Sequence, residues 1–165
     1  MMDNRKLIQD TDRKRALEYQ SRAISKCDQG DFMGAISDFD KAIQFSSSNA
    51  DLYYNRGLAK YKLSDFDGAL HDFDRSLEIN PLDIIAYNDR GNTKCELSDY
   101  LGAIEDYSKS IEINPLEVES YYNRANAKYE LKDINGANED FNKAIAELLK
   151  EEQLSFKTNT TIPGG

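Results

Sequence analysis

The feature that most restricts the fold of this chain is a repeat of 34 residues. The segment YYNRGLAKYKLSDFDGALHDF, which starts at residue 53, aligns without gaps with YNDRGNTKCELSDYLGAIEDY at residue 87 and with YYNRANAKYELKDINGANEDF at residue 121. A more divergent copy, EYQSRAISKCDQGDFMGAISDF, precedes them. A fixed period of this length indicates an array of stacked supersecondary units. The four units are 16–49, 50–83, 84–117 and 118–151, and we number the places within each unit from 1 to 34.

The first half of each unit has the pattern of an α-helix, which we call helix A. A tyrosine occupies place 4 and a small residue occupies place 8, one helical turn later. This spacing puts a ring beside a gap on one helix face, where a neighbouring helix can approach. The residues are Tyr19, Tyr53, Tyr87 and Tyr121, followed by Ala23, Gly57, Gly91 and Ala125.

The second half of each unit predicts a further helix, helix B, after a polar turn. The turn ends in an aspartate, Asp31, Asp65, Asp99 or Asp133, which suits the N-cap of the helix that follows. Small, aromatic and small residues then recur at places 20, 24 and 27, so one stripe faces inward. In the four copies these residues are Ala35, Phe39 and Ala42; Ala69, Phe73 and Ser76; Ala103, Tyr107 and Ser110; and Ala137, Phe141 and Ala144. We interpret these rings as core and not as a binding site.

The ends of the units differ between copies. The second and third copies close with Asn80-Pro81 and Asn114-Pro115, and a proline there stops the helix. The fourth has Leu148-Leu149 at that point, which predicts that its last helix runs on as a C-terminal cap. We expect 152–165 to contain the end of this helix and a disordered tail, and 1–15 to form a charged N-terminal extension or cap.

This arrangement resembles the tetratricopeptide repeat family over residues 16–151. The match rests on the early aromatic, the small residue at place 8, the alanine and aromatic of helix B and the closing proline, although tyrosine replaces the frequent tryptophan and Ser47 replaces the first proline. The resemblance implies an all-α fold, a right-handed superhelical solenoid of antiparallel helix pairs with the A helices on the concave side. It also implies a scaffold or adaptor that binds proteins or peptides without catalysis.

An arginine at place 7 and an aspartate at place 23 recur in all four copies. We hypothesise that each pair forms an ion pair within its repeat, because the planar guanidinium can engage a carboxylate with two hydrogen bonds. The alternative is two unrelated solvated charges. The pairs are Arg22 with Asp38, Arg56 with Asp72, Arg90 with Asp106, and Arg124 with Asp140.

By analogy with the family, places 2, 5, 6, 9, 12 and 13 of each helix A line a peptide-binding groove. The candidate residues are Asp51, Tyr54, Asn55, Leu58, Tyr61, Asn88, Asp89, Asn92, Glu96, Glu119, Tyr122, Asn123, Asn126, Tyr129 and Glu130. Asparagine can donate to and accept from a peptide backbone, and tyrosine offers rigid contact area with a polar tip. The acidic, amide-rich wall predicts a basic or mixed basic and apolar ligand. The alternative is a wall that is polar only for solubility.

Some members of the family bind acidic chaperone tails through a clamp of cationic and asparagine residues. Here Asn55 matches that pattern, but Gln20, Ile85 and Asp89 stand where cations are needed. The resemblance therefore disfavours a co-chaperone role, because the wall would repel an acidic tail.

The net charge of the chain limits the classes of partner that it is expected to bind. With 30 acidic and 21 basic residues, the formal net charge is −9, which opposes binding to nucleic acid or to anionic membranes. There is no long apolar run and no secretory signal pattern, so we expect a cytoplasmic protein. Cys27 and Cys95 lack the spacing of a metal site or a disulfide scaffold, which is consistent with a reducing compartment.

The sequence gives no support for an enzyme, a cofactor or a metal site. The single histidine, His71, is predicted to lie on the outer face of a B helix, and there is no glycine-rich phosphate loop. A second functional reading comes from the basic residues of the N-terminal segment, Arg5, Lys6, Arg13, Lys14 and Arg15. This segment could enter the acidic groove of a neighbouring copy and produce a homodimer or a larger self-association.

Overall fold

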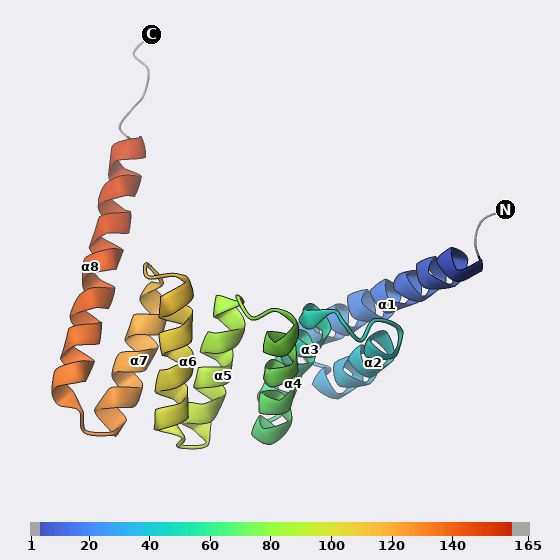
Figure 1. Cartoon of the computed structure of the whole chain (residues 1–165), viewed down its shortest axis with the longest axis horizontal. Helices are drawn as coiled ribbons and strands as arrows, with labels where there is room; N and C mark the ends of the chain where they lie inside the picture. Colours follow the sequence, from blue (N-terminus) through green and yellow to red (C-terminus); the bar gives the residue numbers. More distant parts are fainter. Residues whose placement is uncertain (1–3, 160–165) are drawn as a thin grey trace, which may run out of the picture.

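The computed structural model describes the backbone of residues 4–159 and the side chains of residues 9–150. Over that part of the chain there are eight α-helices and no strand. Figure 1 shows them side by side in a curved row. The helices are α1 (Asn4–Asp28), α2 (Phe32–Phe45), α3 (Ala50–Lys62), α4 (Phe66–Ile79), α5 (Ile84–Glu96), α6 (Tyr100–Ile113), α7 (Val118–Glu130) and α8 (Ile134–Asn159).

The array is a solenoid of helix pairs. Each helix packs on the next one along the chain, and the odd-numbered helices, which are the A helices, also touch across repeats in the pairs α1·α3 and α5·α7. Helices α3, α5 and α7 begin at residues 50, 84 and 118, which are the first residues of the second, third and fourth repeats. The all-helical solenoid predicted from the period of 34 is confirmed.

The turn between helices A and B has the same construction in every repeat. The residue before the aspartate is in the left-handed region, with φ of 79° at Gly30, 59° at Ser64, 61° at Ser98 and 65° at Lys132. This reversal lets the backbone leave helix A and satisfy its last carbonyls. The aspartate that follows accepts a hydrogen bond from the backbone N–H three residues on, at 2.9 to 3.1 Å, in all four repeats. The predicted N-caps are therefore present.

Most of the predicted core positions are buried. Ala35, Ala69 and Ala103 have no exposed surface, and the rings of Phe39 and Phe73 are equally enclosed. The small residue at place 8 is needed for close packing, because a Cβ on Gly91 would lie 2.7 Å from Cε1 of Tyr107. Three of the predicted core rings, Tyr19, Tyr87 and Phe141, are only half-buried, so the prediction is wrong in degree at these positions.

Two long helices stand at the ends of the array. Helix α1 has 25 residues, so segment 4–15 continues directly into the first helix of the first repeat. Helix α8 has 26 residues and runs on past Leu148-Leu149, as the missing proline predicted. Both project beyond the neighbouring helices in Figure 1. Residues 160–165, the last part of the predicted tail, lie outside the described residues. Neither long helix, nor any other in the described part of the chain, is long and apolar enough to cross a membrane.

Candidate functional site: the A-helix face

The framework that holds the site is an ion-pair cluster repeated in every unit. The arginine Nε donates to Oδ2 of the aspartate at 2.6 to 2.9 Å, and Nη2 donates to Oδ1, in all four predicted pairs. The four aspartates are at most 5% exposed. The hypothesis of an ion pair within each repeat is confirmed, and the planar guanidinium makes the two expected hydrogen bonds to the carboxylate from one of its edges.

A lysine at place 11 completes the cluster. Its Nζ lies 2.7 to 2.8 Å from Oδ2 of the same aspartate and also donates to the backbone carbonyl of the glycine at place 19. These residues, Lys26, Lys60, Lys94 and Lys128, were not among the predicted pairs, although their recurrence every 34 residues is a signal in the sequence that could have found them. Each buried carboxylate thus faces two cations.

The same arginines also join neighbouring repeats. Arg56 Nη1 donates to Asp40 and Arg90 Nη1 donates to Asp74, at 2.6 and 2.7 Å, across the joint to the preceding helix B. At the last joint Arg124 donates to the hydroxyl of Ser108 at 3.0 Å. One guanidinium therefore fixes both the pairing of helices within a repeat and the stacking between repeats.

The cations of this cluster stabilise the charged form of the aspartates. The hydrogen bond from Arg22 lowers the pKa of Asp38 well below its usual range, against the opposing effect of burial, and Lys26 adds to the effect. Burial alone would raise the pKa of Asp140, but the hydrogen bonds from Arg124 and Lys128 bring it below the usual value. Both carboxylates are therefore charged at neutral pH.

The predicted groove residues stand on α3, α5 and α7, and we call this surface the A-helix face. Its exposed members concentrate toward the C-terminal half of the array. They are Asp51, Glu96, Glu119, Tyr122, Asn126, Tyr129 and Glu130. Half-buried members are Tyr54, Asn55, Leu58, Tyr61, Asp89, Asn92 and Asn123.

Asn88 differs from the other predicted groove residues. It is 6% exposed, its Nδ2 donates to Ser110 Oγ at 3.2 Å, and its Oδ1 accepts from Ser120 Oγ at 3.0 Å. The two serines are too short to fill the joint between the third and fourth repeats, so the asparagine occupies it. Its amide is committed to the fold, contrary to the expectation from its place in helix A, and we leave it out of the proposed binding surface.

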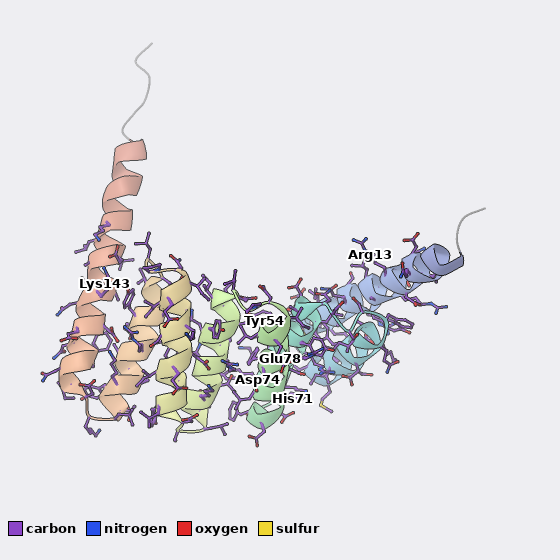
Figure 2. The ribbon with its side chains drawn as sticks, viewed as in Figure 1. Arg13, Tyr54, His71, Asp74, Glu78 and Lys143 are labelled. Atoms are coloured by element: carbon purple, nitrogen blue, oxygen red, sulfur yellow. The ribbon has the colours of Figure 1, made fainter. Side chains whose placement is uncertain are left out.

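Two tyrosines of the A-helix face are bonded to acids in the next repeat. Tyr54 donates to Asp89 Oδ2 at 2.7 Å, and Tyr61 donates to Glu96 Oε1 at 3.1 Å. Burial and these acceptors raise the pKa of both phenols. In Figure 2, Tyr54 is labelled beside α5, whereas His71 and Asp74 are carried by the B helix α4. His71 is exposed, as predicted.

Two hollows open on this face, and both include Asp89. The larger, of about 350 Å³, lies between the third and fourth repeats and is lined by Ile85, Asp89 and Glu119 together with Ile84, Asn88 and Glu117. The smaller, of about 120 Å³, is lined by Leu58, Tyr61, Lys62, Phe73, Asp89 and Asn92. In the larger hollow, Asp89 and Glu119 of successive A helices therefore lie together beside the exposed Ile85. The smaller hollow contains Asp89 as its one acid, together with Lys62.

The surroundings of Asp89 disfavour the charged form of its carboxyl group. Burial raises its pKa, and the charge of Glu119 raises it further, although the hydrogen bonds from Tyr54 and Asn92 act in the opposite direction. Among the described side chains, no lysine or arginine forms an ion pair with Asp89 or Glu119. A cation brought into this hollow would be attracted by both.

Sequence models of known families match most of this array. A model described as "TPR repeat" matches residues 25–64 and 91–132, and a model described as "Tetratricopeptide repeat" matches residues 50–82. The chain belongs to the tetratricopeptide repeat family. No curated protein matches the sequence.

Solved tetratricopeptide structures share the fold. The crystal structure of MamA has a TM-score of 0.82 and 22% identity, covering 90% of this chain and 86% of that one. YrrB, described as a TPR protein with an unusual peptide-binding site, has a TM-score of 0.73 and 23% identity, covering 80% and 68%. The first TPR of Spaghetti (RPAP3), bound to the HSP90 peptide SRMEEVD, has a TM-score of 0.70 and 24% identity, covering 73% and 95%.

Proposed function

We propose that this protein is a non-enzymatic scaffold whose A-helix face binds a segment of another protein that carries basic and apolar side chains. The observation that supports it most directly is the hollow in which Asp89 and Glu119 meet Ile85 without an ion-pair partner among the described side chains. A lysine or arginine of the ligand would neutralise the pair, and an adjacent apolar side chain would cover Ile85, which is 59% exposed.

The ligand chemistry differs from that of the RPAP3 domain. That domain is described as bound to a peptide that contains Glu-Glu-Val-Asp. The A-helix face described here carries Asp89 at one of the places where an acidic tail requires a cation, so it would repel such a peptide. A cytoplasmic location is part of the proposal, since the spacing of Cys27 and Cys95 fits neither a metal site nor a disulfide scaffold.

Fluorescence anisotropy with two matched labelled peptides tests the proposal. One alternates lysine and leucine, and the other has glutamate in place of each lysine. We expect the lysine peptide alone to bind, with an affinity that falls as salt rises, because the attraction is screened. Equal binding of the two peptides, or none at low salt, would contradict the proposed ligand chemistry.

Variants locate the binding. Asp89→Asn and Glu119→Gln remove charge from the hollow with little change in shape, and each is expected to weaken binding of the lysine peptide several-fold. Glu105→Gln is the matched control, because Glu105 is an exposed acid on the B helix α6. Equal losses in all three variants would mean that the overall charge, and not this hollow, attracts the peptide.

A further inference from the structure

The C-terminal end of the array exposes a surface that is covered at every earlier joint. Place 28 of helix B is aliphatic in all four repeats. Ile43 and Ile111 are half-buried and Leu77 is 6% exposed, whereas Ile145 is 55% exposed. In the first three repeats the next helix A packs on helix B, and after α8 no helix follows in the described chain.

A cavity of about 790 Å³ marks this end. It lies between the start of α7 and the middle of α8. Its apolar wall is formed by Leu116, Val118, Tyr122, Ala144, Ile145 and Leu148, and Asn114, Glu117 and Glu119 line its polar side. Leu116 and Tyr122 are 61% and 54% exposed, and Leu148 is 47% exposed. Figure 2 shows α8, with Lys143 labelled, at the outer edge of the row. A contiguous apolar surface of this kind marks an interaction site in a folded protein.

The second repeat shows what fits such a surface. There Tyr54 at place 5 and Ser76 at place 27 are followed by Ala86 at place 3 of the next helix, which has no exposed surface. At the first joint, where Ala42 stands at place 27, the larger Leu52 is buried instead. The end of the array has Tyr122 at place 5, as in the second repeat, and Ala144 at place 27, as in the first repeat. We take the ring at place 5 as the deciding feature, because it is the larger of the two side chains. A ring of this size leaves room for a small side chain opposite.

Two further places define the incoming helix. Place 10, seven residues after place 3, is buried at each joint and carries a side chain no larger than threonine, as Ala59, Thr93 and Ala127. Place 6 carries Asp89, the acceptor for Tyr54. The exposed Tyr122 offers the equivalent donor at the end of the array.

The N-terminal end of the same chain does not fit this surface. Place 3 of the first repeat is Glu18, an exposed acid. Stacking α1 of a second copy on α8 would bury that carboxylate among Tyr122, Ala144 and Ile145, which is strongly unfavourable for an unpaired charge. A two-fold pairing of C-terminal ends is also disfavoured, because both sides would present large exposed side chains, and Ala144, the small residue of the lining, is 5% exposed.

We propose that the C-terminal end of the array binds an amphipathic helix of another protein, which takes the position of the next helix A. The helix carries small residues seven positions apart and a hydrogen-bond acceptor three residues after the first of them. This surface adjoins the A-helix hollow, because Glu117 and Glu119 line both, but it does not include Asp89. The proposal does not depend on the proposed groove ligand.

A synthetic peptide with residues 81–98 of this chain, labelled at its N-terminus and with Cys95→Ser, is the probe. A hydrocarbon staple between positions 87 and 91 keeps it helical. In the intact chain Gly91 faces Tyr107 of its own repeat, so the staple leaves the joint-facing side free. We expect saturable binding to the full-length protein, weakened at least tenfold by Ile145→Glu in the protein or by Ala86→Glu in the peptide.

Two controls separate this surface from others. Leu101→Glu replaces an aliphatic residue that is 67% exposed on α6, and Asp89→Asn alters the A-helix hollow. Both variants should bind the stapled peptide as the unmodified protein does. Circular dichroism of Ile145→Glu checks that the exposed substitution leaves the array folded.

Three results would overturn the proposal. The first is no saturable binding of a peptide shown to be helical, and the second is binding that Ile145→Glu leaves unchanged. The third is a dimer in sedimentation that Ile145→Glu dissociates, because a second copy would then occupy the surface. Loss of lysine-peptide binding alone would count against the proposed groove function and leave this proposal standing.

Discussion

The interior of the repeats and the A-helix face share the A helices, yet the interior is the same in every repeat and the face differs from one repeat to the next. The arginine, lysine and aspartate cluster has the same geometry four times, with Asp72 fully buried and Arg56 Nε 2.8 Å from it. On the A-helix face, place 5 is Tyr54, then the buried Asn88, then the exposed Tyr122. Charges inside the repeats are paired, whereas Asp89 and Glu119 on the face have no ion-pair partner among the described side chains. The interior fixes how the helices pack, and the residue types on the A-helix face can therefore differ between repeats.

The largest contrast between the two regions is expected from inserting the same cation into each. Ala103 has no exposed surface and packs with Tyr107 and Ala127, so Ala103→Arg is expected to lose most of the cooperative unfolding transition, a cost of more than about 4 kcal/mol. Asn126→Arg, on the exposed face, should change the free energy of unfolding by less than about 0.5 kcal/mol. Urea denaturation followed by circular dichroism measures both. A normal transition for Ala103→Arg would refute the assignment of place 20 to the core.

The next effect comes from removing one aspartate of the framework. Asp106→Ala leaves Arg90 and Lys94 without their shared carboxylate and is expected to cost about 3 to 5 kcal/mol. Asp89→Ala should cost far less, because no cation depends on that side chain. A double-mutant cycle on Arg90 and Asp106 checks the origin of the loss, and a coupling energy near zero would show that the two side chains act independently.

The two kinds of carboxylate predict opposite dependences on pH. The folded pKa of Asp38 and Asp140 is lowered, so their stabilisation is full above the unfolded pKa of about 3.9 and is lost as the pH falls toward the folded value. The folded pKa of Asp89 is raised, so its charge costs stability at neutral pH and the cost disappears on acidification.

Urea denaturation between pH 3 and pH 7 measures this contrast. Asp140→Asn should be less stable than the unmodified protein at pH 7 and should lose less stability on acidification. Asp89→Asn should be more stable at pH 7, with the difference closing as the pH falls. The same sign for both variants at pH 7 would remove the distinction between framework and face.

The smallest effect is expected in the turns that connect helix A to helix B of each repeat. Ser98 has φ of 61°, where a side chain costs roughly 1 kcal/mol relative to glycine, so Ser98→Gly should raise the free energy of unfolding by up to that amount. Gly30→Ala, at φ of 79°, should lower it by a similar amount. Thermal melts of the pair provide the test, and equal signs would show that the backbone conformation is not the controlling factor.

Local rules explain why so much of the fold was predictable. The N-caps at Asp65 and Asp99 and the stops at Asn80 and Asn114 depend on residues within a few positions of each other, so a single repeat is enough to recognise them. The pairing of Arg90 with Asp106 reaches sixteen residues along the chain, but the period repeated it four times. Repetition therefore made a tertiary contact visible in the sequence.

The candidate site was less predictable because its contacts cross from one repeat to the next. The hydrogen bond from Tyr54 to Asp89 spans 35 residues and has no counterpart at the following joint, where Asn88 bonds to Ser110 and Ser120 instead. The family pattern assigns the places of Tyr54, Asn88 and Asp89 to one binding groove. Which of these side chains remains exposed depends on the sizes of the side chains that face it.

The sequence by itself determined the number of repeats, the limits of most helices, the buried stripe and the ion pairs, because capping, periodicity and the fixed period of 34 are properties of the chain order. The tertiary structure decided which acids of the A-helix face lie close enough to share a hollow, that Asn88 is enclosed, and that the C-terminal end is left apolar at Tyr122 and Ile145. These outcomes depend on how far successive helix pairs are displaced and on the side-chain volumes at each joint, and neither is set by a local segment.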